Sequence, residues 1–194
     1  MKLLSALLCI VVLVFSHILI VSAEEIEIGY DGGISNAAGY GLGGAKLGVR
    51  FTPPTYPCKV VAAKFYVTRT YEDCSVCNVL ILDDDGSSGA PGSTIFGPTE
   101  AGPADSTGWM RYNIPTEDQF VVETGDFYIN WIYEGCGTLG LSGGATHPER
   151  QWADIFGDWA IFHEDLSFMI RAIVEAENVP TWEYTWGHIK RLYE

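Results

Sequence analysis

Short runs in which apolar and polar residues alternate dominate the chain from residue 46 to residue 174. From Phe127 to Tyr133, for example, every second residue is a large apolar one, and alternate residues of an extended chain share a face. Gly, Pro and Asp-Gly separate the runs, which are rich in β-branched and aromatic residues. The pattern predicts strands over 46–51, 59–68, 78–82, 94–96, 109–114, 126–133 and 168–174.

No long window of the chain has the 3.6-residue period of an amphipathic helix. About eight to ten strands of this kind predict an all-β fold, an antiparallel β-sandwich that is jelly-roll-like. The stretch 143–164 shows neither period and is expected to be irregular. No internal repeat of solenoid length is present.

The first residues read as a targeting segment rather than as part of the fold. Lys2 precedes a nearly continuous apolar run over 3–21, and Val-Ser-Ala then offers small residues before Glu24. This is the pattern of a secretory signal peptide in helical form, with cleavage after Ala23. An uncleaved membrane anchor is the alternative, because the apolar run is long enough to span a bilayer.

The remaining chain divides into a domain and a tail. Residues 24–175 hold all the predicted strands and form the β-sandwich domain. Residues 176–194 begin as a polar linker and end in TWGHIKRLYE, which predicts a short amphipathic helical tail with Trp186, Ile189 and Tyr193 on one face.

Several motifs along the chain carry a resemblance. In order they are IGYDGG, VRFTPPTYPCKVVAAKFYV, VLILDDDGSSGAPG, STGWMRYNI, TGDFYINW, LGLSGG and FMIRAIVE. Together they resemble the β-sandwich module found, often near the C-terminus, in exported multidomain proteins of bacteria. The closing TWGHIKRLYE is similar to the TWGxIKxLYR-type tail of such proteins. The resemblance implies an appended, exported module and supplies no catalytic residue.

Charge narrows the choice of partners. The 194 residues include 11 Lys+Arg and 25 Asp+Glu, which gives a formal net charge of -14. Binding of phosphate backbones needs a basic face, so nucleic acid is excluded as a partner. The hydrophobic fraction of 47% is enough for a folded core.

Cysteine positions predict a disulfide bond. Export favours pairing of the four cysteines that follow the signal peptide. A hairpin of 59–68 and 78–82 would place Cys58 at one end of the sandwich and Cys74 and Cys77 at the other, because a ten-residue strand spans roughly 33 Å.

Alternating strand directions after residue 78 then place Cys136 at the end that holds Cys74 and Cys77. The sequence therefore predicts a bond from Cys136 to Cys74 or Cys77. If 94–96 is not a strand, the direction flips, and Cys58 would pair with Cys136 and Cys74 with Cys77.

Asp83, Asp84 and Asp85 form an acidic loop between two predicted strands. Crowded carboxylates offer the oxygen ligands that Ca²⁺ prefers, which makes calcium a candidate cofactor, while no other cofactor is expected. The alternative is a hairpin turn, since Asp-Gly sequences favour tight turns and no Glu follows at EF-hand spacing.

Aromatic residues offer a second candidate site. Trp109 and Trp131 fall in predicted strands and are expected in the core. Trp152 and Trp159 fall in the irregular stretch, where exposed rings would bind a carbohydrate by stacking.

Residues for catalysis are sparse. His147, His163 and His188 have acidic neighbours, but HExxH and GxSxG motifs are absent. The chain is therefore predicted not to be an enzyme, but a non-catalytic exported module, secreted or at the cell surface, with an adhesive, surface-structural or partner-supporting role. The alternatives are a carbohydrate-binding module and a secreted hydrolase. The expected partner is a surface protein or polysaccharide, and contact with the membrane is expected only during export.

Overall fold

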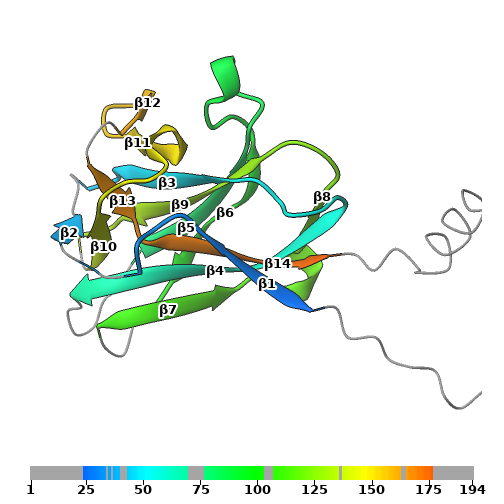
Figure 1. The fold of residues 1–194 in the computed structure, drawn as a ribbon, viewed down its shortest axis with the longest axis horizontal. Coiled ribbons are helices and arrows are strands. Elements are labelled where there is room, and N and C mark those ends of the chain that lie inside the picture. The colour runs from blue at the N-terminus through cyan, green and yellow to red at the C-terminus, as the bar shows by residue number, and fades with distance from the viewer. Residues whose placement is uncertain are drawn as a thin grey trace, which may run out of the picture.

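The chain folds into two antiparallel β-sheets that lie one above the other in the computed structural model (Figure 1). The structure describes residues 24–33, 35, 37–39, 43–69, 77–102, 107–135, 137–162 and 165–176. One sheet has eight strands and the other has six. The prediction of an all-β fold with antiparallel sheets is confirmed.

The eight-stranded sheet is built around one long central strand. Its members are β1 (Glu25–Gly29), β2 (Ala37–Gly39), β4 (Cys58–Arg69), β7 (Gly108–Asn113), β8 (Phe120–Val122), β10 (Thr138–Gly143), β13 (Leu166–Phe168) and β14 (Ile170–Ala176). The main order is β1-β14-β4-β10-β13, and β2 pairs with β10. The 12-residue β4 has β14 and then β10 along one edge, and β8 and then β7 along the other.

The six-stranded sheet has the order β12-β11-β3-β9-β5-β6. Its members are β3 (Lys46–Phe51), β5 (Cys77–Asp83), β6 (Thr94–Ala101), β9 (Phe127–Tyr133), β11 (Gln151–Asp154) and β12 (Trp159–Ile161). The short 3₁₀ helices η1 (Ser87–Gly89), η2 (Thr116–Asp118) and η3 (Pro148–Arg150) lie in the connections. Strands β6 and β12 are the two edges of this sheet.

The hydrophobic core lies between the two sheets. Alternation along each strand sends every second apolar side chain there, such as Val49 of β3 and Ile129 of β9, and both are fully buried. Phe65 of β4 meets Trp131 of β9 edge-on across the core, with ring centroids 5.7 Å apart. A second buried cluster lies on the outer face of the six-stranded sheet and contains Leu80, Leu82, Tyr128, Ile132 and Trp152.

The predicted strands agree closely with the structure. The runs 46–51, 59–68, 78–82, 109–114 and 126–133 coincide with β3, β4, β5, β7 and β9 to within one residue at either end. The run at 94–96 begins β6, which continues to Ala101, and the run at 168–174 is divided between β13 and β14.

Two predictions about the arrangement of strands are wrong. Strands β4 and β5 do not form a hairpin, because β4 belongs to the eight-stranded sheet and β5 to the six-stranded one. The stretch 143–164 is not irregular throughout, since it contains β11 and β12. Strand β11 has only four residues, with the polar Gln151 and Asp154 at its two ends, so the sequence shows no alternating run there.

The predicted signal helix over 1–23 and the predicted helical tail after residue 176 lie outside the described residues. Within the described part of the chain, no helix has the length and apolar character needed to cross a membrane.

Candidate functional site

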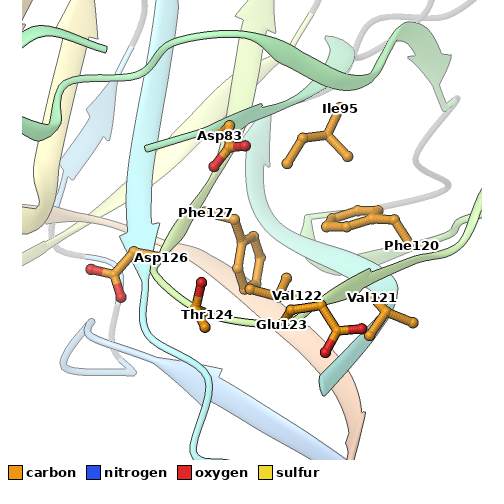
Figure 2. A pocket seen from close by; sticks show the side chains of 9 residues that line it. All are labelled: Asp83, Ile95, Phe120, Val121, Val122, Glu123, Thr124, Asp126 and Phe127. Atoms are coloured by element: carbon orange, nitrogen blue, oxygen red, sulfur yellow. The ribbon is translucent and has the colours of Figure 1, made fainter. Parts of the chain in front are cut away.

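A pocket of about 290 Å³ lies where β5 ends and β9 begins (Figure 2). Strand β8 of the opposite sheet and the first part of β6 complete its walls. The lining residues are Asp83, Ile95, Phe120, Val121, Val122, Glu123, Thr124, Asp126 and Phe127.

The path of the chain explains the position of the pocket. Asp83, the last residue of β5, pairs with Phe127, the first residue of β9. The three-residue β8 pairs with the first residues of β4 in the other sheet. Residues 123–126 therefore carry the chain from one sheet to the other, and the pocket lies beside this crossing.

Hydrogen bonds fix the turn at the crossing. Gly125 has a φ of +81°, in the left-handed region that favours glycine. The hydroxyl of Tyr56 donates to the carbonyl oxygen of Gly125 at 2.6 Å, and the backbone N–H of Asp126 donates to Oδ2 of Asp84 at 3.2 Å. A side chain at position 125 would begin 3.2 Å from Oδ1 of Asp84. The turn is thus held on both sides, and the pocket is preformed.

Aromatic and aliphatic side chains form the inner wall. The ring of Phe120 meets the ring of Phe127 edge-on, with centroids 6.1 Å apart and an interplanar angle of 82°. Phe127 is fully buried and stacks in turn on Phe51. Figure 2 shows Ile95 beside these rings, so one side of the pocket is apolar.

Three carboxylates belong to the lining, and they differ in their partners. Oδ2 of Asp126 lies 2.6 Å from Nε of Arg50, and Figure 2 shows this carboxylate pointing away from the apolar wall. Oδ1 of Asp83 accepts the backbone N–H of Asp84 at 2.8 Å. Glu123 is exposed and has no hydrogen-bond or ion-pair partner among the described residues. Its charge is therefore available to a ligand.

Arg50 is the cation behind the pocket. Burial alone would lower the pKa of Arg50, but Tyr128, Asp126 and Asp84 around it raise that pKa, so the guanidinium stays charged. Burial raises the pKa of Tyr128 to about 12, against the opposing influence of Arg50. The Tyr128 hydroxyl donates to the carbonyl oxygen of Gly89, which ties the loop over η1 to β9.

The acidic loop Asp83–Asp85 uses its carboxylates to hold the turn. Oδ1 of Asp85 accepts the backbone N–H of Ser93 at 2.6 Å, and Oδ2 of Asp84 lies 3.4 Å from Nη2 of Arg50. Within the part of the chain that the structure describes, no group of three or more His, Cys, Asp or Glu side chains is placed to hold a metal ion. These contacts favour the turn interpretation, and calcium binding by this loop stays a prediction.

The two tryptophans predicted to bind a carbohydrate do not form an exposed platform. Trp152 lies in β11 with 8% of its surface exposed, meets Tyr128 edge-on and donates its indole N–H to the carbonyl oxygen of Glu149 at 3.2 Å. Trp159 is half-buried in β12, with Nζ of Lys46 5.7 Å from its ring centroid. Trp152 is buried because β11 packs into the second buried cluster, and carbohydrate binding by Trp152 and Trp159 stays a prediction.

The two tryptophans predicted to lie in the core, Trp109 and Trp131, differ in burial. Trp131 is fully buried between the sheets, as predicted. Trp109 is only half-buried and lies beneath Arg171, whose guanidinium carbon is 4.1 Å from the ring centroid. The prediction of Trp109 as a core residue is therefore wrong.

The cysteine prediction falls partly outside the described residues. Cys58 and Cys77 have free, buried thiols. Burial raises the pKa of both thiols, and the charge of Glu134 adds to the effect at Cys77. Cys74 and Cys136 lie outside the described residues. The predicted partners of Cys136 are Cys74 and Cys77, and the free thiol of Cys77 leaves Cys74 as the candidate. A bond between Cys74 and Cys136 stays a prediction.

The histidine considered for a hydrolase lies away from the pocket. His147 is exposed, and its Nδ1 lies 3.3 Å from one carboxylate oxygen of Glu149. Its ring packs edge-on against Tyr30. His163 and His188 lie outside the described residues.

Of the pocket residues, the sequence singled out Asp83 alone. Phe120 and Val122 belong to a strand of three residues, too short for a periodic pattern. The pocket forms where strands of both sheets meet, so no local motif marks it.

Fold and site together define an all-β module with a small pocket at the crossing between its sheets. No protein-family model and no curated protein matches the chain. Among solved structures, that of the clostridial cysteine protease Cwp84 after propeptide cleavage is similar, with a TM-score of 0.55 and 14% identity over 79% of this chain and 40% of that chain.

A second similar structure contains the cysteine protease and lectin-like domains of Cwp84, a surface layer associated protein of Clostridium difficile. Here the TM-score is 0.53 and the identity 13%, over 80% of this chain and 37% of that one. The chain thus spans about two fifths of the length of these proteins. At this identity the likeness is one of fold.

Proposed function

We propose that this chain is a non-catalytic, exported β-sandwich module with jelly-roll-like topology, secreted or at the cell surface, that binds a partner there. The likeness of fold to chains of Cwp84, a surface layer associated protein, supports this role. The apolar N-terminal run, which ends in small residues before Glu24 as at a signal-peptide cleavage site, supports export. The partner is a surface protein or a polysaccharide, and the net charge of -14 disfavours nucleic acid.

The composition of the pocket is the observation that carries this proposal. Binding pockets combine apolar walls with a few placed polar groups, and this pocket has both. Its lining includes no Cys, His, Lys or Ser, so it lacks the nucleophile–histidine pair on which many hydrolases depend. The carboxylate of Asp126 is already paired with Arg50. The arrangement therefore supports binding better than catalysis.

Carbohydrate binding is the alternative, and Phe120 favours it. The ring is partly exposed beside carboxylates that would accept hydrogen bonds from sugar hydroxyls. The lectin-like domain named for the similar protein supports the same alternative.

The test begins with expression of the full chain in a bacterial host. We expect the protein outside the cytoplasm with Glu24 as its first residue, as read by N-terminal sequencing. The exported protein is then titrated against immobilised cell-wall polysaccharide and against a surface-protein fraction. Saturable binding that weakens in Phe120→Leu and Glu123→Gln, but not in Phe156→Ala far from the lining, supports the proposal.

Two results would overturn it. The first is cleavage of the polysaccharide or of the surface proteins by the wild-type chain, abolished in Asp126→Asn. The second is the lack of saturable binding to either fraction by a protein that has been exported and is folded by circular dichroism.

A further inference from the structure

The side chains that line the pocket are acceptors rather than donors. Ionised carboxylates only accept hydrogen bonds, and the hydroxyl of Thr124 is the one side-chain donor among the lining residues. A ligand that satisfies this site must therefore supply the hydrogen-bond donors.

The charge of the site is also unbalanced. Asp83, Glu123 and Asp126 lie in the lining, and Arg50 behind them neutralises Asp126. Lys59 is opposite Val121 in the register of β4 and β8, but it is not a lining residue. A negative surplus thus remains at the mouth, where Glu123 is exposed.

The apolar wall sets a second requirement. Ile95 and Phe120, which are only partly buried, offer contact to hydrocarbon, and an aromatic face attracts a cation that approaches it. The long stems of lysine and arginine pack on apolar surface while the charged head stays near water. A volume of about 290 Å³ lies at the lower end of the range for ligand pockets, which suits one side chain better than an oligosaccharide.

Resting on the binding role proposed above, we propose that this pocket accepts the side chain of a lysine or arginine of a partner protein. The aliphatic stem lies along Phe120 and Ile95, and the charged head meets the carboxylate of Glu123. The mouth of the pocket is accessible to such a partner, because Val121 is 39% exposed and Glu123 and Thr124 are exposed too.

Short peptides test this inference directly. Acetylated and amidated Ala-Ala-X-Ala-Ala, with X as lysine, arginine or norleucine, is titrated into the exported protein while backbone amide shifts are followed by NMR. Norleucine keeps the aliphatic stem and removes the charge. We expect saturable shifts at residues 120–126 with the lysine and arginine peptides, and binding at least about tenfold weaker with norleucine.

A pair of variants distinguishes binding of the peptide in the pocket from the general attraction of a cationic peptide to an acidic protein. Glu123→Gln should weaken binding of the lysine peptide by about three- to tenfold, because it removes one exposed charge at the mouth. Asp158→Asn removes the same charge beside β12, at the opposite edge of the six-stranded sheet, and should leave the affinity unchanged. Both side chains are exposed, so both variants should keep the wild-type melting temperature.

Three results would overturn the inference. They are equal affinity for the norleucine peptide, equal weakening by Glu123→Gln and Asp158→Asn, and displacement of the peptide by a cell-wall oligosaccharide that shifts the same amides. If the peptides fail while saturable surface binding persists, this inference fails and the proposed function stands. If the peptides bind as expected while surface binding is lacking, the proposed function fails instead.

Discussion

Asp31 carries a carboxylate with no exposed surface, and Arg171 balances it. Nε and Nη2 of Arg171 donate to the two carboxylate oxygens at 2.9 and 2.8 Å, and the Asp31 side chain is 0% exposed. The hydrogen bonds to Asp31 are the largest influence that raises the pKa of Arg171. Nη1 reaches Glu27 at 2.6 Å, and the guanidinium lies over Trp109. Removal of the arginine would leave this buried carboxylate without its cation, held by the backbone N–H of Gly33, which donates to Oδ1 at 2.8 Å.

Arg171→Met should therefore lower the free energy of unfolding by about 3–5 kcal/mol, the usual cost of breaking a buried ion pair. Methionine keeps an apolar side chain over Trp109, so the loss of stability reports the missing charge rather than missing packing. The matched control is Arg111→Met, whose bidentate partner Glu25 is 46% exposed, and the expected loss there is about 0–1 kcal/mol. Urea titration measures both variants, and equal losses would contradict the assignment.

Two phenylalanines should respond in opposite ways to truncation. Phe127 is 0% exposed and contacts Phe51 and Phe120, whereas Phe156 is 87% exposed at the tip between β11 and β12. Phe127→Ala should cost about 3–5 kcal/mol of unfolding free energy through lost burial and a cavity. Phe156→Ala should stay within about 0.5 kcal/mol of the wild type. A large loss on truncation of Phe156, measured by thermal or urea denaturation, would mean that the tip packs against a part of the chain outside the described residues.

At the scale of elements, the sequence predicts the longer strands that are rich in β-branched and aromatic residues. Strand β9 shows the reason, since the sequence predicts a strand over its seven residues although six of them are buried. Strand β11 is not predicted, because it has only four residues and the polar Gln151 and Asp154 stand at its two ends. Three-residue strands such as β8 and β12 are shorter than any period that a pattern can reveal.

Pairing is less predictable than the strands themselves. Consecutive strands pair about two-thirds of the time, and the hairpin prediction for β4 and β5 relied on that tendency. The chain instead changes sheets after β4, because both strands bury an apolar face and can do so against each other across the core. The pocket likewise depends on a change of sheet, in this case the crossing between β8 and β9.

The register of β5 and β9 sharpens the disulfide prediction. Cys77 pairs with Tyr133 in this antiparallel ladder. Cys74 precedes Cys77 by three positions, and Cys136 follows Tyr133 by three positions. Both cysteines therefore lie three positions beyond the last pair of this ladder along the chain, which favours Cys74 over Cys58 as the predicted partner of Cys136.

Peptide mapping under alkylation should show two classes of cysteine in the exported protein. Cys58 and Cys77 should resist iodoacetamide in the native state and react after unfolding without reductant, because their thiols are buried. Cys74 and Cys136 should appear in one linked peptide that separates only on reduction. A linked peptide that contains Cys58 or Cys77 would contradict the prediction.

For the whole molecule, acidic groups outnumber basic ones, and several of the basic side chains form ion pairs between strands. Glu27 of β1 meets Lys64 of β4 at 2.7 Å as well as Arg171 of β14, and Glu25 of β1 meets Arg111 of β7. These pairs connect strands across the outer face of the eight-stranded sheet. The hydrogen bonds from Arg111 lower the pKa of Glu25. Burial alone would raise the pKa of Glu27, but Lys64 and Arg171 outweigh it, so the net shift is downward.

These shifts predict a loss of stability in acid. A carboxyl group whose pKa is lower in the folded state binds more protons in the unfolded chain, so it stabilises the fold above its ordinary pKa of 4.5 and loses that contribution as the pH falls through the lowered value. The free energy of unfolding, from urea titrations between about pH 7 and pH 3, should therefore fall steeply below about pH 4.5.

Glu27→Gln assigns part of this acid sensitivity to the cross-strand pairs. The variant lacks the carboxylate that Lys64 and Arg171 hold, so it should be less stable than the wild type at pH 7 and should approach the wild-type stability as the pH falls through the lowered pKa of Glu27. Glu117→Gln, at an exposed position of η2, should leave the pH profile unchanged. A constant difference between Glu27→Gln and the wild type at every pH would show that packing, rather than ionisation of Glu27, ties β1 to the sheet.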